Sequence, residues 1–220
     1  MSISYDLVRH DPKVRSYIKR QDENLVSLGY TEHSFNHVCR VSHTVGTLLQ
    51  QLEYDENLVE LGRVAGYLHD LGNVINRVDH AQSGALIAFR LLEDLGGSPD
   101  DIATIISAIG NHDEGTGFPV SPVAAALILA DKSDVRRSRV RERDMAFFDI
   151  HDRVNYAVSN ATSGLTPDKT TYQLNLTIDT TISAVMDYFE IFLGRMLFCR
   201  KAAEKLNLKF QLVINDQVIL

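Results

Sequence analysis

The apolar residues of the first 160 positions recur with a helical period, and this pattern most narrows the choice of fold. Stripes spaced three and four residues apart cover successive segments, which short turns with glycine, proline or aspartate separate. We expect helices over residues 11–28, 34–53, 56–71, 80–96, 99–111 and 121–135, and a less regular helix over 142–160. The sequence therefore predicts a mainly α-helical body.

The period changes in the last quarter of the chain. Residues 171–179 and 209–214 have the character of half-buried strands, and a long amphipathic helix is expected between them over 180–206. Small and turn-forming residues over 159–169 suggest a linker. We therefore predict a helical domain over 1–163 and a strand–helix–strand extension over 164–220. Because two strands alone are marginal in water, the extension should pack on the body and contribute to a homodimer.

Charge and composition limit the partners of the chain. A net charge of −7 argues against binding to extended nucleic acid, yet residues 131–143 hold six of the 22 basic residues. A local basic patch on an acidic body favours a small anionic ligand. The chain has no apolar run of about 18 residues, which a membrane span would need, and no secretory pattern at its start. With two widely spaced cysteines, expected to be reduced and half-buried, we predict a cytoplasmic protein.

Side chains that can bind metals occupy the apolar faces or the ends of five predicted helices. Asp131, for example, ends the unbroken apolar run Val123–Ala130, where a buried carboxylate needs a cation or a metal. Four histidines and two aspartates exceed the needs of a structural zinc site and suit two ions such as iron, manganese, magnesium or zinc. The candidate ligands are His37, His69, Asp70, His80, His112 and Asp131.

The order and context of these residues resemble the HD-domain superfamily of metal-dependent phosphohydrolases. The first histidine lies in HVCRVSHTV, the signature pair in AGYLHDLGN and the last aspartate in LILADKSD. The two further histidines match the subset that binds two metals. The resemblance covers residues from about 30 to 137 and implies a helical bundle with the metals between its helices. It implies that the first metal is held by His37, His69, Asp70 and Asp131, and the second by His80 and His112, with Asp70 bridging.

The resemblance also implies hydrolysis of a phosphate ester or anhydride, on a nucleotide or another small phosphorylated metabolite, by a metal-activated water that Asp70 orients. Many members have lysine where this chain has Asn73, so we expect Asn73 to meet the phosphate without bringing charge. Two alternatives stay open. Some relatives with the same ligand order are di-iron oxygenases, and the domain could also be a sensor that binds a nucleotide without turnover.

The basic run predicts one further feature of the site. Lys132, Arg136, Arg139 and Arg143 follow helical spacing and would form a ridge that begins beside Asp131. We expect Lys132 and Arg136 to bind the substrate phosphate, with Lys132 also neutralising charge during catalysis. The other histidines are expected at the surface or without a role in the site: His10, His33, His43 and His151.

Overall fold

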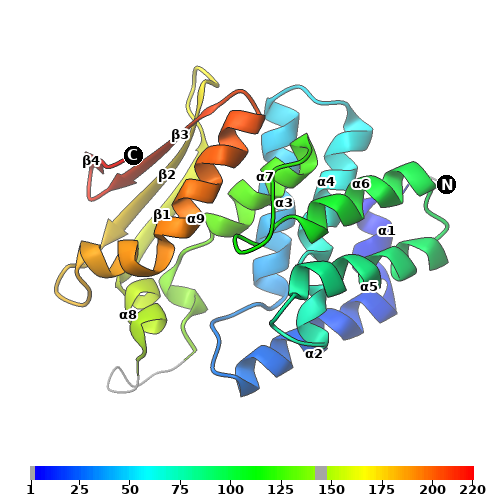
Figure 1. Cartoon of the computed structure of the whole chain (residues 1–220), viewed down its shortest axis with the longest axis horizontal. Coiled ribbons are helices and arrows are strands. Elements are labelled where there is room, and N and C mark those ends of the chain that lie inside the picture. Colours follow the sequence, from blue (N-terminus) through cyan, green and yellow to red (C-terminus); the bar gives the residue numbers. More distant parts are fainter. Residues whose placement is uncertain (1–2, 142–147) are drawn as a thin grey trace.

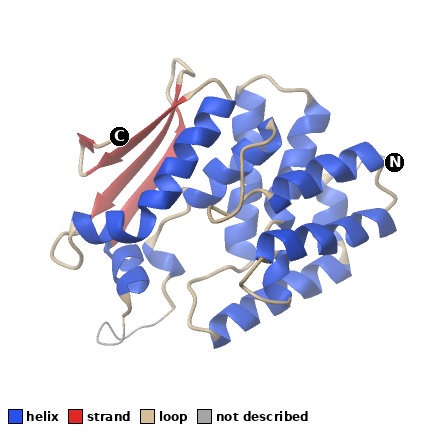
Figure 2. Cartoon of the chain, in the orientation of Figure 1, coloured by secondary structure: helices blue, strands red, loops and turns tan. Residues whose placement is uncertain are grey.

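The computed structural model describes residues 3–141 and 148–220 of the chain. Most of its helices form one side of the molecule, and its strands gather on the other side together with the last two helices (Figure 1, Figure 2). The helical part contains α1 (Tyr5–His10), α2 (Pro12–Ser27), α3 (Phe35–Gln51), α4 (Glu56–Leu68), the 3-10 helix η1 (Leu71–Val74), α5 (His80–Asp94), α6 (Pro99–Gly110), α7 (Pro122–Lys132), the 3-10 helix η2 (Arg137–Arg139) and α8 (Ile150–Ala157).

Short polar side chains fix where several of these helices begin. Asp55, Ser98 and Ser121 each accept a hydrogen bond from a backbone N–H three residues further on, which satisfies a donor that the first turn leaves free. Proline follows the cap at the start of both α6 and α7, where its missing N–H costs nothing. The starts of the predicted helices are therefore accurate to within one residue here.

The central helix is α7, which is buried on every side. Its residues from Val123 to Ala130 are all buried, and it packs against α3, α4, α6 and α9 (Val185–Lys205). A helix that is apolar all round belongs inside a protein. The consequence is that Asp131, which follows this run, is carried into the interior.

A sheet of four strands in the order β1-β2-β3-β4 completes the fold. Strand β2 (Thr171–Ile178) pairs antiparallel with β1 (Val158–Leu165) and parallel with β3 (Lys209–Ile214), which in turn pairs antiparallel with the short β4 (Gln217–Val218). Parallel neighbours need a crossover connection, and α9 provides it. In Figure 1 this helix lies across the sheet, between the strands and α7.

The prediction of a mainly helical protein with a small C-terminal strand-containing part is confirmed, but some details differ. Residues 158–165 form β1 where the sequence suggested a linker, so a boundary between residues 163 and 164 would fall within this strand. The two parts also share one hydrophobic core, which contains Leu174 and Phe192 together with the interior of α7. Of the two cysteines expected to be half-buried, Cys39 is exposed and Cys199 is buried.

The helix predicted over 121–135 is too long. It ends at Lys132, and the backbone of Arg136 is extended, with φ −162° and ψ 146°. The expected ridge of basic residues is therefore wrong, and its last member, Arg143, lies outside the described residues. Helix α8 occupies the second half of the predicted segment 142–160, while residues 142–147 are not described. In the part of the chain that is described, no helix has the length and apolar character to cross a membrane.

Candidate metal centre

The structure gathers all six candidate ligands in the interior of the helical part. His37 lies in the first turn of α3, and Asp131 lies near the end of α7. The others stand where helices begin or end: His69 and Asp70 between α4 and η1, His80 at the start of α5, and His112 just after α6.

A glycine lets two of these segments approach closely. A Cβ atom on Gly72 would lie 1.9 Å from the backbone oxygen of His80, which is far inside van der Waals contact. Only glycine allows the backbone of η1 to lie against the first turn of α5 in this way. This contact places Asp70 and His80 on facing segments, with Oδ1 of the aspartate 3.8 Å from Nε2 of the histidine.

The ligand atoms of these residues form three overlapping groups among the described residues. Within each group the atoms lie within 4.8 Å of one another. The groups are His37, His69 and Asp70; His69, His112 and Asp131; and Asp70, His80 and His112. Together they contain the whole candidate set, and each group has the size and chemistry to hold a metal ion.

The hydrogen bonds of the imidazole rings direct one nitrogen of each histidine into the cluster. In three of them Nδ1 faces a backbone carbonyl oxygen. The distance is 2.9 Å from His69 to Gly66, 3.1 Å from His80 to Arg77, and 2.6 Å from His112 to Ile109. A carbonyl can only accept, so Nδ1 carries the proton and donates it. When such a ring is neutral, Nε2 presents a lone pair to the cluster, which is the arrangement found in metal-binding histidines.

At two places inside the cluster, atoms with lone pairs face each other or face no donor, and a bound cation would satisfy them. Nε2 of His80 lies 3.2 Å from Nε2 of His112, and two lone pairs at this distance repel. Oδ2 of Asp70 is buried and makes no hydrogen bond to any described residue. It faces Nε2 of His69 at 3.3 Å. A positive ion among these atoms would satisfy them all, since imidazole and carboxylate are ligands of divalent metals.

The electrostatics of the cluster also demand positive charge. Burial lowers the pKa of His69, but Asp70 and Asp131 outweigh burial and raise this pKa to about 10. Burial raises the pKa of both aspartates. This effect is outweighed by His69 for Asp70 and mainly by Lys132 for Asp131, so both pKa values lie well below the usual range. Burial also lowers the pKa of His80 and His112, which favours the neutral rings that bind metals.

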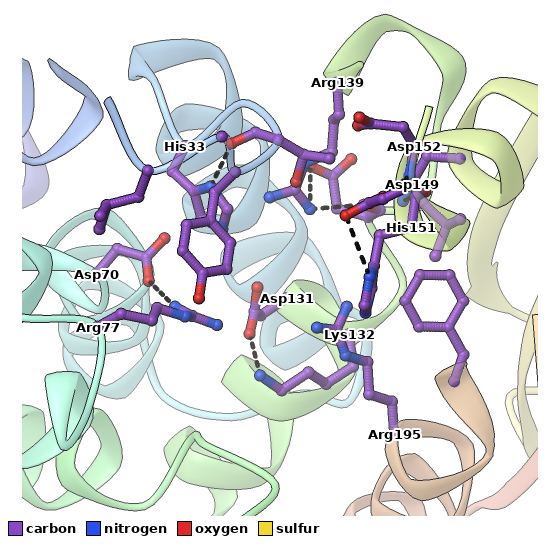
Figure 3. A pocket seen from close by; sticks show the side chains of 18 of the residues that line it. His33, Asp70, Arg77, Asp131, Lys132, Arg139, Asp149, His151, Asp152 and Arg195 are labelled. Carbon is purple, nitrogen blue, oxygen red and sulfur yellow. Dashed lines mark hydrogen bonds and ion pairs between the residues drawn. The ribbon is translucent and has the colours of Figure 1, made fainter. Parts of the chain in front are cut away.

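A pocket of about 360 Å³ opens beside the cluster, with Asp70, His80 and Asp131 in its wall (Figure 3). Its other walls come from the connection between α2 and α3, from α8 and from α9. Positively charged side chains reach it from several directions: Arg77, Lys132, Arg139 and Arg195. Carboxylates of Asp134, Asp149 and Asp152 line the pocket as well, so groups of both charges face it next to the candidate ligands.

The residues predicted to bind substrate lie in different places. Lys132 lines the pocket, and its Nζ lies 2.7 Å from Oδ2 of Asp131. Asn73 is buried and absent from the pocket wall; its amide donates to Oδ1 and to the carbonyl oxygen of Asp70. Arg136 binds Asp134 and lines a second pocket instead, which follows from the early end of α7.

Several residues of this region were not predicted from the sequence. His33, expected at the surface, is only 8% exposed, and its ring lies 5.5 Å from that of His37. Asp134 accepts a hydrogen bond from Nδ1 of His37 at 2.7 Å. Arg77 and Arg195 come from segments without any recognisable motif. The spacing of Asp134, three residues after Asp131, is the one signal in the sequence that could have identified it.

Comparisons with known proteins found one family model and two similar proteins. A family model described as the HD domain matches residues 34–154, which is more than half of the chain. An uncharacterized protein of Methanocaldococcus jannaschii, MJ1020, is 24% identical over 161 residues, a match that covers 62% of this chain and 61% of that protein. A crystal structure of a predicted HD superfamily hydrolase from an uncultured Thermotogales bacterium matches with a TM-score of 0.46 and 23% identity, covering 58% of this chain and 69% of that one.

Proposed function

The chain belongs to the HD-domain family, and on this premise we propose that it is a metal-dependent phosphohydrolase acting on a small phosphate ester or anhydride. The observation that carries the proposal is the convergence of imidazole nitrogens and carboxylates beside a pocket that four positively charged side chains also line. We propose two divalent ions, held by His37, His69, Asp70 and Asp131 and by Asp70, His80 and His112.

Bound divalent ions would lower the pKa of a water molecule and draw charge from the phosphoryl oxygens. The protein's own part is to fix the groups around that water. Asp70 offers its two oxygens to opposite halves of the cluster, since Oδ2 faces His69 and Oδ1 faces His80. The amide of Asn73 holds Oδ1 at 3.0 Å and so keeps the carboxylate in this orientation. This support suits a carboxylate that orients water.

The charge beyond the cluster favours a phosphate ligand over a neutral one. Lys132 is nearly buried between Asp131 and Glu114, at 2.7 Å and 2.8 Å, and fixes positive charge beside the cluster. Arg77 reaches the same region from the opposite side, with Nη1 4.0 Å from Oδ1 of Asp70. Fixed cations that are already oriented stabilise the charge that develops on phosphoryl oxygens.

The test combines metal analysis with a screen for phosphate release. The purified full-length protein is loaded with magnesium, manganese, zinc or iron and incubated with nucleotides and other small phosphate esters. Release of phosphate that depends on added metal supports the proposal. A protein that binds metal but releases no phosphate from any compound of the screen would contradict it.

A further inference from the structure

One cation of the pocket comes from outside the region that matches the family model. Arg195 lies on α9, which is beyond residue 154, and lines the pocket together with Asp70 and Asp131. Figure 3 shows its side chain rising from α9 towards Lys132 and Asp131. Its side chain is 29% exposed, which leaves it open to the pocket without making it a surface group.

The guanidinium of Arg195 is held in a fixed position by two neighbours. Its Nε lies 2.8 Å from Oε1 of Glu114, while the other oxygen of that carboxylate lies 2.8 Å from Nζ of Lys132. Its plane lies over the ring of Phe192, with the central carbon 4.8 Å from the ring centroid. Glu114 and Phe192 thus order the side chain before any ligand arrives.

This arrangement leaves the end of the guanidinium available. The bond to Glu114 runs through Nε, and the two Nη groups of Arg195 make no hydrogen bond with any residue in the described part of the chain. The ammonium group of Lys132, in contrast, is already shared between Asp131 and Glu114. A fork of two parallel N–H groups is the geometry that binds two oxygens of one phosphate.

We propose that Arg195 binds the phosphate of the substrate through its two Nη groups, so that the C-terminal extension completes the active site. This inference rests on the phosphohydrolase proposed above. Arg77 would contact the same phosphate from the other side of Asp131, where Figure 3 places it. Its polar contacts with described residues are long, at 3.4 Å to Oδ1 of Asn73 and 4.0 Å to Oδ1 of Asp70, which leaves most of its N–H donors available.

The number of available cations also limits the class of substrate. Among the described cations of the wall, Lys132 is shared between Asp131 and Glu114, and Arg139 lies against Asp134. Arg195 also faces Glu114, but through Nε, and Arg77 makes only long contacts, so these two guanidinium groups keep N–H donors for a ligand. Two guanidinium groups beyond the metal ligands suit a single phosphate group, whereas a polyphosphate chain would leave several charges unmatched. The pocket of about 360 Å³ is near the lower limit for small-molecule sites. The substrate is therefore a small phosphomonoester.

The direct test measures binding of inorganic phosphate to the manganese-loaded full-length protein by titration calorimetry. Removal of a charged, bidentate contact in Arg195→Ala should raise the dissociation constant about 10- to 100-fold. Arg195→Lys keeps the charge but loses the fork, so its dissociation constant should lie between those of the wild type and Arg195→Ala. The matched control is Arg200→Ala on the same helix, where the arginine is exposed and absent from the pocket wall.

Metal content and melting temperature are measured for each variant, so that a folding defect is recognised. Should Arg195→Ala alone misfold, Arg195→Lys and Arg195→Gln take its place in the same titration. Unchanged phosphate affinity in folded variants of Arg195 would overturn the inference. If the wild type binds phosphate through Arg195 but hydrolyses no ester, the inference stands and the proposed hydrolase does not. If esters are hydrolysed with no dependence on Arg195, the hydrolase stands and the inference falls.

Discussion

The carboxylate of Asp134 accepts a hydrogen bond from Nδ1 of His37 at 2.7 Å, while Nε2 of the same ring lies 3.4 Å from Asp131. The contact fixes both the orientation of the ring and the nitrogen that faces the cluster. Asp134 is itself held by Arg136 and Arg139. Burial raises its pKa, but His37 and Arg139 hold the pKa well below its usual range, so the carboxylate stays charged.

The first prediction concerns this pair. Asp134→Asn removes the charge that supports His37 and should weaken metal binding about 10- to 100-fold. Equilibrium dialysis against manganese or zinc measures the effect. Asp216→Asn is the control, because Asp216 is exposed and its φ of 63° suits asparagine equally well. Equal metal affinity in the two variants would show that Asp134 does not support the centre.

The second prediction concerns the carboxylate shared by the two halves of the cluster. Because its oxygens face His69 and His80 separately, Asp70→Ala should lose both metal ions and all activity. His80→Ala should lose one ion and retain the other. Elemental analysis after gel filtration gives the number of ions per chain. Two ions retained by Asp70→Ala would refute the assignment of Asp70 as a bridging ligand.

The third prediction separates the two basic residues expected at the substrate. Lys132→Ala removes a buried charge beside Asp131 and should lower kcat/KM for phosphate release about 10- to 100-fold. Arg136→Ala should change it less than threefold at saturating metal, because Arg136 lines a different pocket and Arg139 still faces Asp134. Steady-state kinetics on the same ester measure both. A larger effect at Arg136 than at Lys132 would contradict this assignment and show that Arg136 serves the substrate.

The fourth prediction concerns the C-terminal extension. A chain ending at Ser163 lacks β2 and α9, so β1 loses its partner strand and the face of α7 that α9 covers is exposed. We expect this chain to aggregate or to unfold. Sedimentation velocity compares it with the full-length protein, which the sequence predicts to be a homodimer. A soluble, fully active fragment would show that the extension is neither structural nor part of the site.

The fifth prediction decides between hydrolysis and oxygen chemistry, which the same ligand set can serve. Phosphate release should continue without oxygen and should be supported by magnesium, manganese or zinc, since the pocket supplies its own cations for the phosphate. The assay is run in an anaerobic chamber with defined metals. Turnover that requires both iron and dissolved oxygen, with no phosphate released, would favour the oxygenase alternative.

The helical part and the candidate ligands could be predicted because one physical rule governs both. A residue in phase with an apolar stripe is carried to the interior, and this holds for His37 on α3 and for Asp131 after the apolar run of α7. The supporting residues follow no such rule. Asp134 and Glu114 lie in connections after α7 and α6, and their direction depends on neighbours distant in the sequence.

Two errors have an equally physical origin. The spacing of Lys132 and Arg136 fits a helix, but charged residues at helical spacing do not require one, and the backbone is extended at Arg136. Residues 158–165 include serine, asparagine and glycine, which indicate a turn. They form a strand because their backbone groups pair with those of β2, which is their antiparallel neighbour in the sheet. Tertiary contacts outweigh local preference at both places.

The parallel pairing of β2 with β3 has a consequence for synthesis on the ribosome. The ribosome extends a chain by roughly 5–20 residues per second. All six candidate ligands precede residue 132, whereas Arg195 and the strand that anchors its helix are made several seconds later. The nascent chain therefore contains all six candidate ligands before α9 can cover α7, and the sheet can be completed only after β3 has been made.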